Sequence, residues 1–541
     1  MPRWLRAGRG LPLMATVAAL TTLALLPAPA LALTAEQARA IATGETDARV
    51  AALGLAAADP AQAQPLALLV RALLDDAVKT AGDKVFIVAG GKTLEAGPMT
   101  AAALPDAAED VVNNNRMRGA LQAALAGLKL FSPAPAARRE AVKELLKDSL
   151  GDAQLPLIAK AFSAETDPDL KDQLGRMQAG ILIASPDKAR RLAAAKTLSG
   201  SGQSSDKALL QERLKAGAET DPDVRGALMQ SLAQVQDRLA WGERLGVVFT
   251  GLSLGSILLL VALGLAITYG LMGVINMAHG ELMMIGAYAT YLVQNLFRTH
   301  LPGWFDGYIL AAVPVSFLVA AGVGAVLERS VIRWLYGRPL ETLLATWGIS
   351  LVLMQSVRSL FGAQNVQVEN PGWLSGGVAV MSNLTLPFNR IAIIGFAVLV
   401  LGGVALLIAR TRLGLFVRGV TQNRRMAACV GVDTARVDTL AFALGSGLAG
   451  LAGCALSQVG NVGPDLGQSY IVDAFMVVVL GGVGQLAGTV IAALGLGVLN
   501  KLLEGLAGAV LAKIMVLVVI VVFIQKRPQG LFAMKGRSAE A

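Results

Sequence analysis

The sequence predicts an all-α protein in two parts, an exported helical domain followed by a polytopic bundle of eight or nine membrane-spanning helices. Three observations support this prediction. Of 541 residues, 54% are hydrophobic and only 16% are charged, whereas soluble proteins carry roughly 25% charged residues. The charges gather before about residue 245, and residues 246–275 and 515–524 hold none. The charged part shows helical periodicity rather than the alternation of strands.

The first 32 residues have the layout of a secretory signal peptide. Arg3, Arg6 and Arg9 precede an apolar stretch at 11–26, and Ala30 and Ala32 supply the small residues of a cleavage site. The alternative is an uncleaved anchor helix. Either one places residues 33–245 outside the cytoplasm.

An internal repeat runs through residues 33–245. Residues 165–171 return 54 positions later as residues 219–225, and residues 138–146 are echoed by residues 190–198, which lie 52 positions later. Each copy supplies two amphipathic helices, and each Asp-Pro step offers an N-cap followed by a proline in the first helical turn. The pattern predicts a short α-helical repeat that resembles the HEAT type.

Residues 91–93 read Gly-Lys-Thr, as in a phosphate-binding loop. That loop requires a glycine five positions before Gly91, where this chain has Phe86. Residues 85–88 and 92–94 instead predict a small β-hairpin around Gly90-Gly91. The sequence offers no metal-ligand cluster and no nucleophilic triad, so we expect an interaction role for this domain and neither enzymatic activity nor a cofactor.

Residues 246–532 alternate apolar runs with short polar loops. The main runs approach the roughly 20 residues that a helix needs to cross the hydrocarbon core of a bilayer. A glycine-rich break at 481–488 divides one run into two short or re-entrant arms. We expect spans at about 246–270, 282–297, 308–327, 342–361, 390–409, 437–458 and 506–525, with a pair within 471–502.

Basic residues predict the orientation of the bundle. Three arginines lie between 329 and 338, and six lie between 410 and 436. The C-terminal segment holds Lys526, Arg527, Lys535 and Arg537 and ends in a tail at 533–541. The positive-inside rule places all three segments in the cytoplasm and requires an odd number of crossings. The basic residues behind the net charge of +9 therefore indicate how the chain is oriented in membrane lipid. They do not indicate binding to nucleic acid. Cys429 in a cytoplasmic loop and Cys454 in a span should both be reduced.

Three polar clusters interrupt the apolar runs. Polar groups at membrane depth are costly and usually mark a pathway for a solute. The alternative for each cluster is a loop with satisfied helix caps. The candidate pathway residues are Asn276, His279 and Glu281 in the first cluster, Thr346 and Trp347 in the second, and Asp465, Gln468 and Tyr470 in the third.

Four motifs follow one another along residues 246–532. They are Asn-Met-Ala-His-Gly-Glu at 276–281, Leu-Leu-Ala-Thr-Trp-Gly-Ile-Ser at 343–350, Thr-Arg-Leu-Gly at 411–414 and Val-Val-Val-Leu-Gly-Gly-Val-Gly at 477–484. In content and order they resemble the permeases of branched-chain amino acid and urea ABC transporters. The large N-terminal domain and residues 341–347, 364–368 and 460–470 are more similar to the urea branch.

The resemblance implies an inner-membrane permease subunit that forms half of a pathway for urea. A second permease, two cytoplasmic ATPases and a periplasmic substrate-binding protein would be its partners, since this chain lacks a P-loop. Side-chain amides, hydroxyls and carboxylates suit a small neutral solute such as urea. The alternatives are import of branched-chain amino acids or short-chain amides by the same family, and a membrane receptor whose exported domain senses a ligand.

Residues 422–431 occupy the place of the short cytoplasmic helix by which ABC permeases contact their ATPases. The broad Glu-Ala-Ala…Gly signature is altered here, because Met426 replaces the glutamate and the glycine comes one residue early. The alternative is a solvated basic loop. The residues expected to couple to the ATPase are Arg424, Arg425, Ala427, Ala428 and Gly431.

Overall fold

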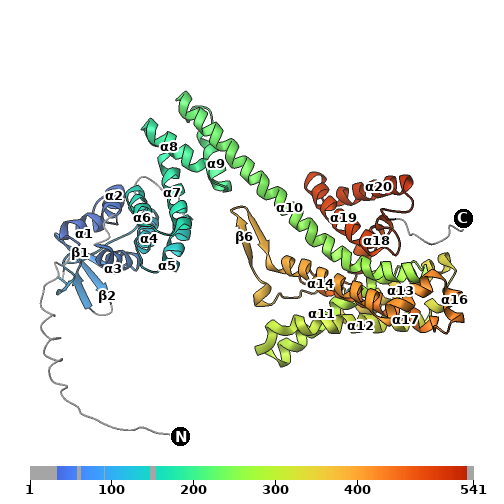
Figure 1. Cartoon of the computed structure of the whole chain (residues 1–541). Coiled ribbons are helices and arrows are strands. Elements are labelled where there is room, and N and C mark those ends of the chain that lie inside the picture. Colours follow the sequence, from blue (N-terminus) through green and yellow to red (C-terminus); the bar gives the residue numbers. More distant parts are fainter. Residues whose placement is uncertain (1–32, 58–61, 90–91, 106, 147–153, 533–541) are drawn as a thin grey trace, which may run out of the picture. The chain divides into compact units, whose positions relative to one another are not determined.

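The computed structural model describes residues 33–57, 62–89, 92–105, 107–146 and 154–532 (Figure 1). The predicted signal peptide at 1–32, the tail at 533–541 and the turn at 90–91 lie outside these ranges. The chain divides into two compact units, Met1–Gln236 and Asp237–Ala541. Helix α10 (Pro222–Met272) begins in the first unit and ends in the second.

The first unit is a helical region with a small antiparallel sheet, whose strand order is β4-β3-β2-β1-β5. Its described elements before α10 are α1 (Ala35–Ala42), α2 (Thr46–Ala57), α3 (Ala63–Leu74), β1 (Val78–Ala81), β2 (Lys84–Ala89), β3 (Lys92–Glu95), β4 (Thr100–Ala101), β5 (Glu109–Asp110), α4 (Asn115–Lys129), α5 (Pro135–Leu145), α6 (Leu155–Ala164), α7 (Pro168–Leu182), α8 (Lys188–Ser199) and α9 (Ser204–Arg213).

The sheet corrects the all-α prediction for residues 78–110. The predicted hairpin is confirmed, because β2 and β3 pair antiparallel with Val88 opposite Thr93. The other three strands are only two to four residues long, too short to show an alternating pattern. Val85 and Ile87 are buried in one apolar core with residues of α1–α4, so packing against helices stabilises these short strands.

The internal repeat appears as the same ion pair in successive copies. Arg138 Nε lies 2.9 Å from Glu165 Oε2, and Arg191 Nε lies 2.9 Å from Glu219 Oε2. Arg138 also donates to Ser132 O at 3.0 Å. Burial alone would raise the pKa of Glu165, but hydrogen bonds from Arg138 and from two backbone N–H groups hold that pKa below its ordinary value.

The second unit is a helical bundle. Its described elements after α10 are α11 (His279–His300), α12 (Tyr308–Ser330), α13 (Pro339–Phe361), β6 (Gly377–Met381), β7 (Leu384–Pro387), α14 (Phe388–Arg410), α15 (Arg412–Gln422), α16 (Arg424–Cys429), α17 (Thr434–Ser457), α18 (Leu466–Gly481), α19 (Leu486–Ala507) and α20 (Ala509–Lys526), with short 3-10 turns at 302–307, 332–335 and 372–374.

Seven described helices are long and apolar enough to cross a membrane: α10, α12 with the turn before it, α13, α14, α17, α19 and α20. Of the eight or nine predicted spans, the other two correspond to α11 and α18. The 22 residues of α11 are too polar to qualify. The 16 residues of α18 reach only about 24 Å, short of the roughly 30 Å hydrocarbon core.

Helices α11, α12 and α17 pack against one another within the bundle (Figure 1). Backbone-to-backbone contact at glycines brings these helices together. A Cβ at Gly453 would meet the carbonyl oxygen of Met283, and one at Gly286 would meet the backbone of Gly450. Because hydrophobicity drives little association within lipid, such close packing of small residues stabilises the bundle.

Helices α18, α19 and α20 form a second group (Figure 1). The predicted glycine-rich break between α18 and α19 is confirmed: Gly482 and Gly484 have φ angles of +96° and +75°, a conformation that favours glycine. The C-terminal segment returns to this turn, where Leu531 N donates to Leu480 O at 2.8 Å.

Candidate functional site

The chain between α10 and α11 is not helical and folds back along α10. Gly273, with φ +65°, ends α10, and residues 273–276 form neither helix nor strand. His279 Nε2 then lies 3.1 Å from the carbonyl oxygen of Val261, which precedes the end of α10 by roughly 16 Å of helix. Helix α11 therefore begins beside the middle of the apolar part of α10. We call residues 273–278 the return segment.

Helix α13 satisfies the backbone of the return segment. Thr346 Oγ1 accepts from Met277 N at 3.2 Å and lies 3.3 Å from the carbonyl oxygen of Ile275. The Asn276 side chain accepts from Ala278 N at 3.1 Å. Irregular backbone at membrane depth requires such partners, because lipid offers none.

A buried carboxylate follows the return segment in the first turn of α11. Glu281 is 1% exposed, and its Oε1 accepts from Ser350 Oγ at 3.0 Å. Within the described residues, Glu281 Oε2, Asn276 Nδ2 and His279 Nδ1 have no hydrogen-bond partner. Buried polar atoms are normally paired. The free carboxylate oxygen of Glu281 could therefore accept a hydrogen bond from a polar solute.

The first turn of α18 meets the first turn of α11. A Cβ at Gly467 would touch the backbone of Gly280 and Glu281, so only glycine permits this approach. Just before α18, Val462 and Val366 exchange backbone hydrogen bonds at 2.8 and 2.9 Å. Two helix N-termini, each with a partial positive charge, thus converge beside Glu281.

The structure brings together some of the predicted pathway residues and not others. Asn276, His279, Glu281 and Thr346 are buried and lie within or beside the return segment. Asp465 and Gln468 are exposed and Tyr470 is half-buried at the start of α18, while Trp347 is exposed on another face of α13. Sequence reasoning missed Ser350, although its position four residues after Thr346 places both on one face of a helix.

The predicted coupling segment forms α16, a helix of six residues. Asn423 caps its start by accepting from Met426 N at 3.0 Å. At its end, Gly431 has φ +88°, and Val432 N donates to Ala427 O at 3.0 Å while Gly431 N donates to Ala428 O at 3.1 Å. This is a Schellman motif, so Gly431 ends the helix.

The predicted coupling residues divide between two faces of α16. Ala427 is buried in the core of the bundle, whereas Arg425 and Ala428 are exposed. Arg424 points inward and forms an ion pair with Asp438 of α17, whose side chain is 0% exposed. Among the described residues, Arg425 has no side-chain partner and is free to contact another protein.

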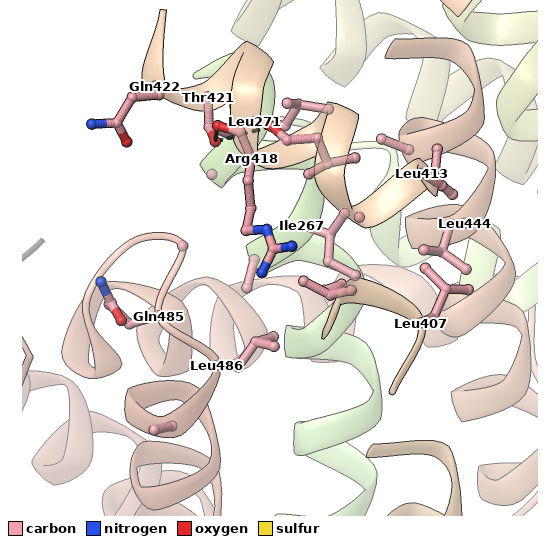
Figure 2. Close-up of a pocket in the computed structure, with 18 residues that line it drawn as sticks. Ile267, Leu271, Leu407, Leu413, Arg418, Thr421, Gln422, Leu444, Gln485 and Leu486 are labelled. Atoms are coloured by element: carbon pink, nitrogen blue, oxygen red, sulfur yellow. Dashed lines mark hydrogen bonds between the residues drawn. The ribbon is translucent and has the colours of Figure 1, made fainter. Parts of the chain in front are cut away.

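A cavity of about 410 Å³ lies beside α15 and was not predicted from the sequence. Its walls come from the last turns of α10 and α14, from α15 and α17, and from the turn between α18 and α19 (Figure 2). Most of the lining is apolar, and Figure 2 shows Arg418 extending into it. None of the predicted pathway residues lines this cavity.

Comparison with known proteins places the second unit in one family. Residues 247–524 match the family described as the permease component of branched-chain amino acid transport systems. The chain is 31% identical over 252 residues to the high-affinity branched-chain amino acid transport permease BraD of Pseudomonas aeruginosa, a match that covers 46% of this chain and 82% of BraD. It is 30% identical over 263 residues to LivH of Escherichia coli, a permease of the same type, covering 47% of this chain and 84% of LivH.

A more distant relative is the autoinducer 2 import permease LsrC of Salmonella paratyphi B, which is 31% identical over 193 residues, covering 35% of this chain and 53% of LsrC. No solved structure gave a significant match. None of these three names mentions urea, so they do not support the urea branch. Because the family match spans more than half of the chain, the protein belongs to the branched-chain amino acid transport permease family and is a multi-pass, non-catalytic transport subunit of an ABC importer.

Proposed function

We propose that this chain forms half of the translocation pathway of an ABC importer for a branched-chain amino acid. The observation that supports this most is the match to BraD and LivH across 82% and 84% of their lengths. By analogy with those systems, a second permease, two cytoplasmic ATPases and a periplasmic binding protein complete the transporter. The first unit would then lie in the periplasm and α16 in the cytoplasm.

The return segment and the first turn of α11 form the solute site in this proposal. Glu281 Oε2 would accept a hydrogen bond from the ammonium group of an amino acid, and the converging N-termini of α11 and α18 would attract its carboxylate. These groups are buried in the described structure. Solute therefore reaches them only when the ATPases change the packing around α11 and α13.

Urea is the second candidate, and the N-terminal unit favours it. Less than a fifth of BraD or LivH lies outside its match to this chain, which leaves those proteins no room for a counterpart of residues 33–236. A large N-terminal domain is one of the features that make this chain resemble urea permeases. Glu281 Oε2 would accept from a urea N–H group, and Asn276 Nδ2 would donate to its carbonyl oxygen.

Uptake of radiolabelled leucine and urea by cells lacking this chain tests the proposal. Loss of leucine uptake alone, restored by the intact gene, is the expected result. Loss of urea uptake alone would establish the second candidate and refute the first. If neither uptake changed, the chain would not be an importer of either solute, and a receptor role would become the better explanation.

The N-terminal unit would dock the binding protein or cover the periplasmic mouth of the pathway. This proposal follows from its position in the chain, directly before the first span and on the side where solute is delivered. Deleting residues 33–221 should abolish association with the binding protein, measured by co-purification, and reduce uptake. Normal association together with normal uptake would refute the proposal.

A further inference from the structure

The Arg424 side chain links helix α16 to the membrane helix α17. The Arg424 guanidinium forms a two-point contact with Asp438 of α17: Nη2 contacts Oδ2, and Nη1 lies 3.4 Å from Oδ1. Asp438 is completely buried, while the Arg424 side chain is 42% exposed. A buried carboxylate needs a partner, and a two-point contact fixes the direction of the arginine as well as its position.

The same arginine contacts Tyr336, in the loop between α12 and α13. Its Cζ lies 5.1 Å from the centroid of the Tyr336 ring, a cation–π distance. The Tyr336 hydroxyl donates to Glu328 Oε1 at 2.9 Å, and Thr439 donates to Glu328 Oε2 at 2.5 Å. Glu328 of α12 is completely buried, so this hydrogen-bonded network links α16 to both α12 and α17.

The network also reaches the return segment. The Tyr336 hydroxyl lies 3.1 Å from Sδ of Met272, the last residue of α10. Val274 of the return segment is buried in a small apolar cluster with Ile332 and Phe442, against which Met272 and Tyr336 pack. Contacts are therefore continuous from α16 to the position two residues before Asn276.

We propose that Arg424 is a positioning residue that transmits movement of the ATPase-bound α16, through Asp438 and Tyr336, to the return segment. The inference rests on the proposed function, in which the exposed face of α16 binds an ATPase. That face carries Arg425 and Met426, the latter 59% exposed. Arg424 faces the other way and acts within its own chain.

The first test uses the assembled complex in lipid vesicles and measures solute transported per ATP hydrolysed. Arg424→Ala should lower this ratio on the order of ten-fold, within the range of measured couplings between distant sites. Arg424→Lys retains the charge but loses the two-point contact, so its ratio should lie between those of Arg424→Ala and the parent protein. Arg436→Ala is the matched control, because Arg436 is an exposed cytoplasmic arginine whose side chain has no partner in the described ranges. Equal ratios for Arg424→Ala and this control would overturn the proposal.

A double variant separates positioning from folding. Arg424→Ala alone leaves a buried charge on Asp438 and should reduce the yield of assembled complex, whereas Arg424→Ala with Asp438→Asn removes that charge. The double variant should recover its assembly while transport per ATP stays low. If transport recovers together with assembly, Arg424 has only a structural role and the proposal fails.

A thiol at Met277 provides a readout that does not depend on the identity of the solute. In a chain carrying Met277→Cys and Cys429→Ser, ATP should change the rate of thiol modification, and Arg424→Ala should abolish that change. An ATP response that is absent, or that survives Arg424→Ala, would overturn the proposal. An intact response without uptake of leucine or urea would instead refute only the proposed solute.

Discussion

The close contact between α11 and α17 makes Gly453 a sensitive position. A Cβ there would meet the carbonyl oxygen of Met283 and would lie 2.8 Å from Ala287 N. Both neighbours are backbone atoms, which cannot rotate away as side chains do, so the two helices must separate. Gly453→Ala should therefore disturb the centre of the bundle and the helix that carries Glu281.

The expected magnitude follows from two opposing terms. Overpacking costs about 3 kcal/mol when the surroundings cannot yield, and replacing a helical glycine by alanine returns about 1 kcal/mol. The net loss in free energy of unfolding is about 2 kcal/mol, or roughly 4 °C in melting temperature for a domain of this size. Gly403→Ala on α14 is the matched control, since a Cβ there meets nothing within 4 Å, and it should be neutral or stabilising.

Thermal unfolding of the purified full-length chain in detergent, followed by light scattering, measures both variants. Gly453→Ala should melt several degrees below the parent protein, and Gly403→Ala at or above it. Equal melting temperatures for the two variants would show that α11 and α17 do not pack as described.

Three further predictions concern other parts of the chain. Ser350→Ala removes the hydrogen bond to Glu281 and should reduce uptake about ten-fold, because hydrogen bonds to charged groups contribute roughly 1.5–3 kcal/mol. The control Ser356→Ala loses only a hydrogen bond within its own helix and should leave uptake unchanged. Equal effects of the two variants on uptake would contradict a role of Glu281 in the solute site. Since the pKa of Glu165 is lowered on folding, its stabilisation is present above the pKa of the unfolded chain and is lost as pH falls through the folded value. Glu165→Gln should therefore destabilise residues 155–182 by about 3 kcal/mol at neutral pH and by less in acid. Hydrogen exchange of these residues measures the loss. A loss that does not depend on pH would contradict the role of the Glu165 carboxylate. The exposed thiol of Cys429 should react with an impermeant maleimide in inverted vesicles and not in intact spheroplasts, and the reverse result would contradict the orientation.

Much of the membrane half could be predicted because a segment that crosses lipid must form a long apolar helix. Long apolar runs mark helices, and glycines with polar residues mark breaks, so the return segment and the break after α18 were both located. The partners of the polar residues were not predictable. Ser350 lies in an ordinary apolar helix, and its role emerges only when α13 packs against Glu281.

The inward-facing groups around α16 were also missed. Glu328 and Asp438 stand near helix ends, where acidic residues are common and usually solvated, and nothing local in the sequence indicates that both are buried. Arg424 was assigned to the ATPase contact together with Arg425, because a basic loop does not reveal which arginine faces the bundle. In the N-terminal unit, β4 and β5 are too short for any pattern, and tertiary packing decides their structure.

The most direct test of the account is the composition of the complex that this chain forms in its native membrane. Affinity purification in mild detergent, followed by mass determination, should recover one copy of this chain with a second permease and two ATPase subunits. Replacing Arg425 and Ala428 on the exposed face of α16 by acidic residues should release the ATPases and leave the permease pair intact. Recovery of this chain alone, or retention of the ATPases by that variant, would contradict the assignment of α16 as the point of contact.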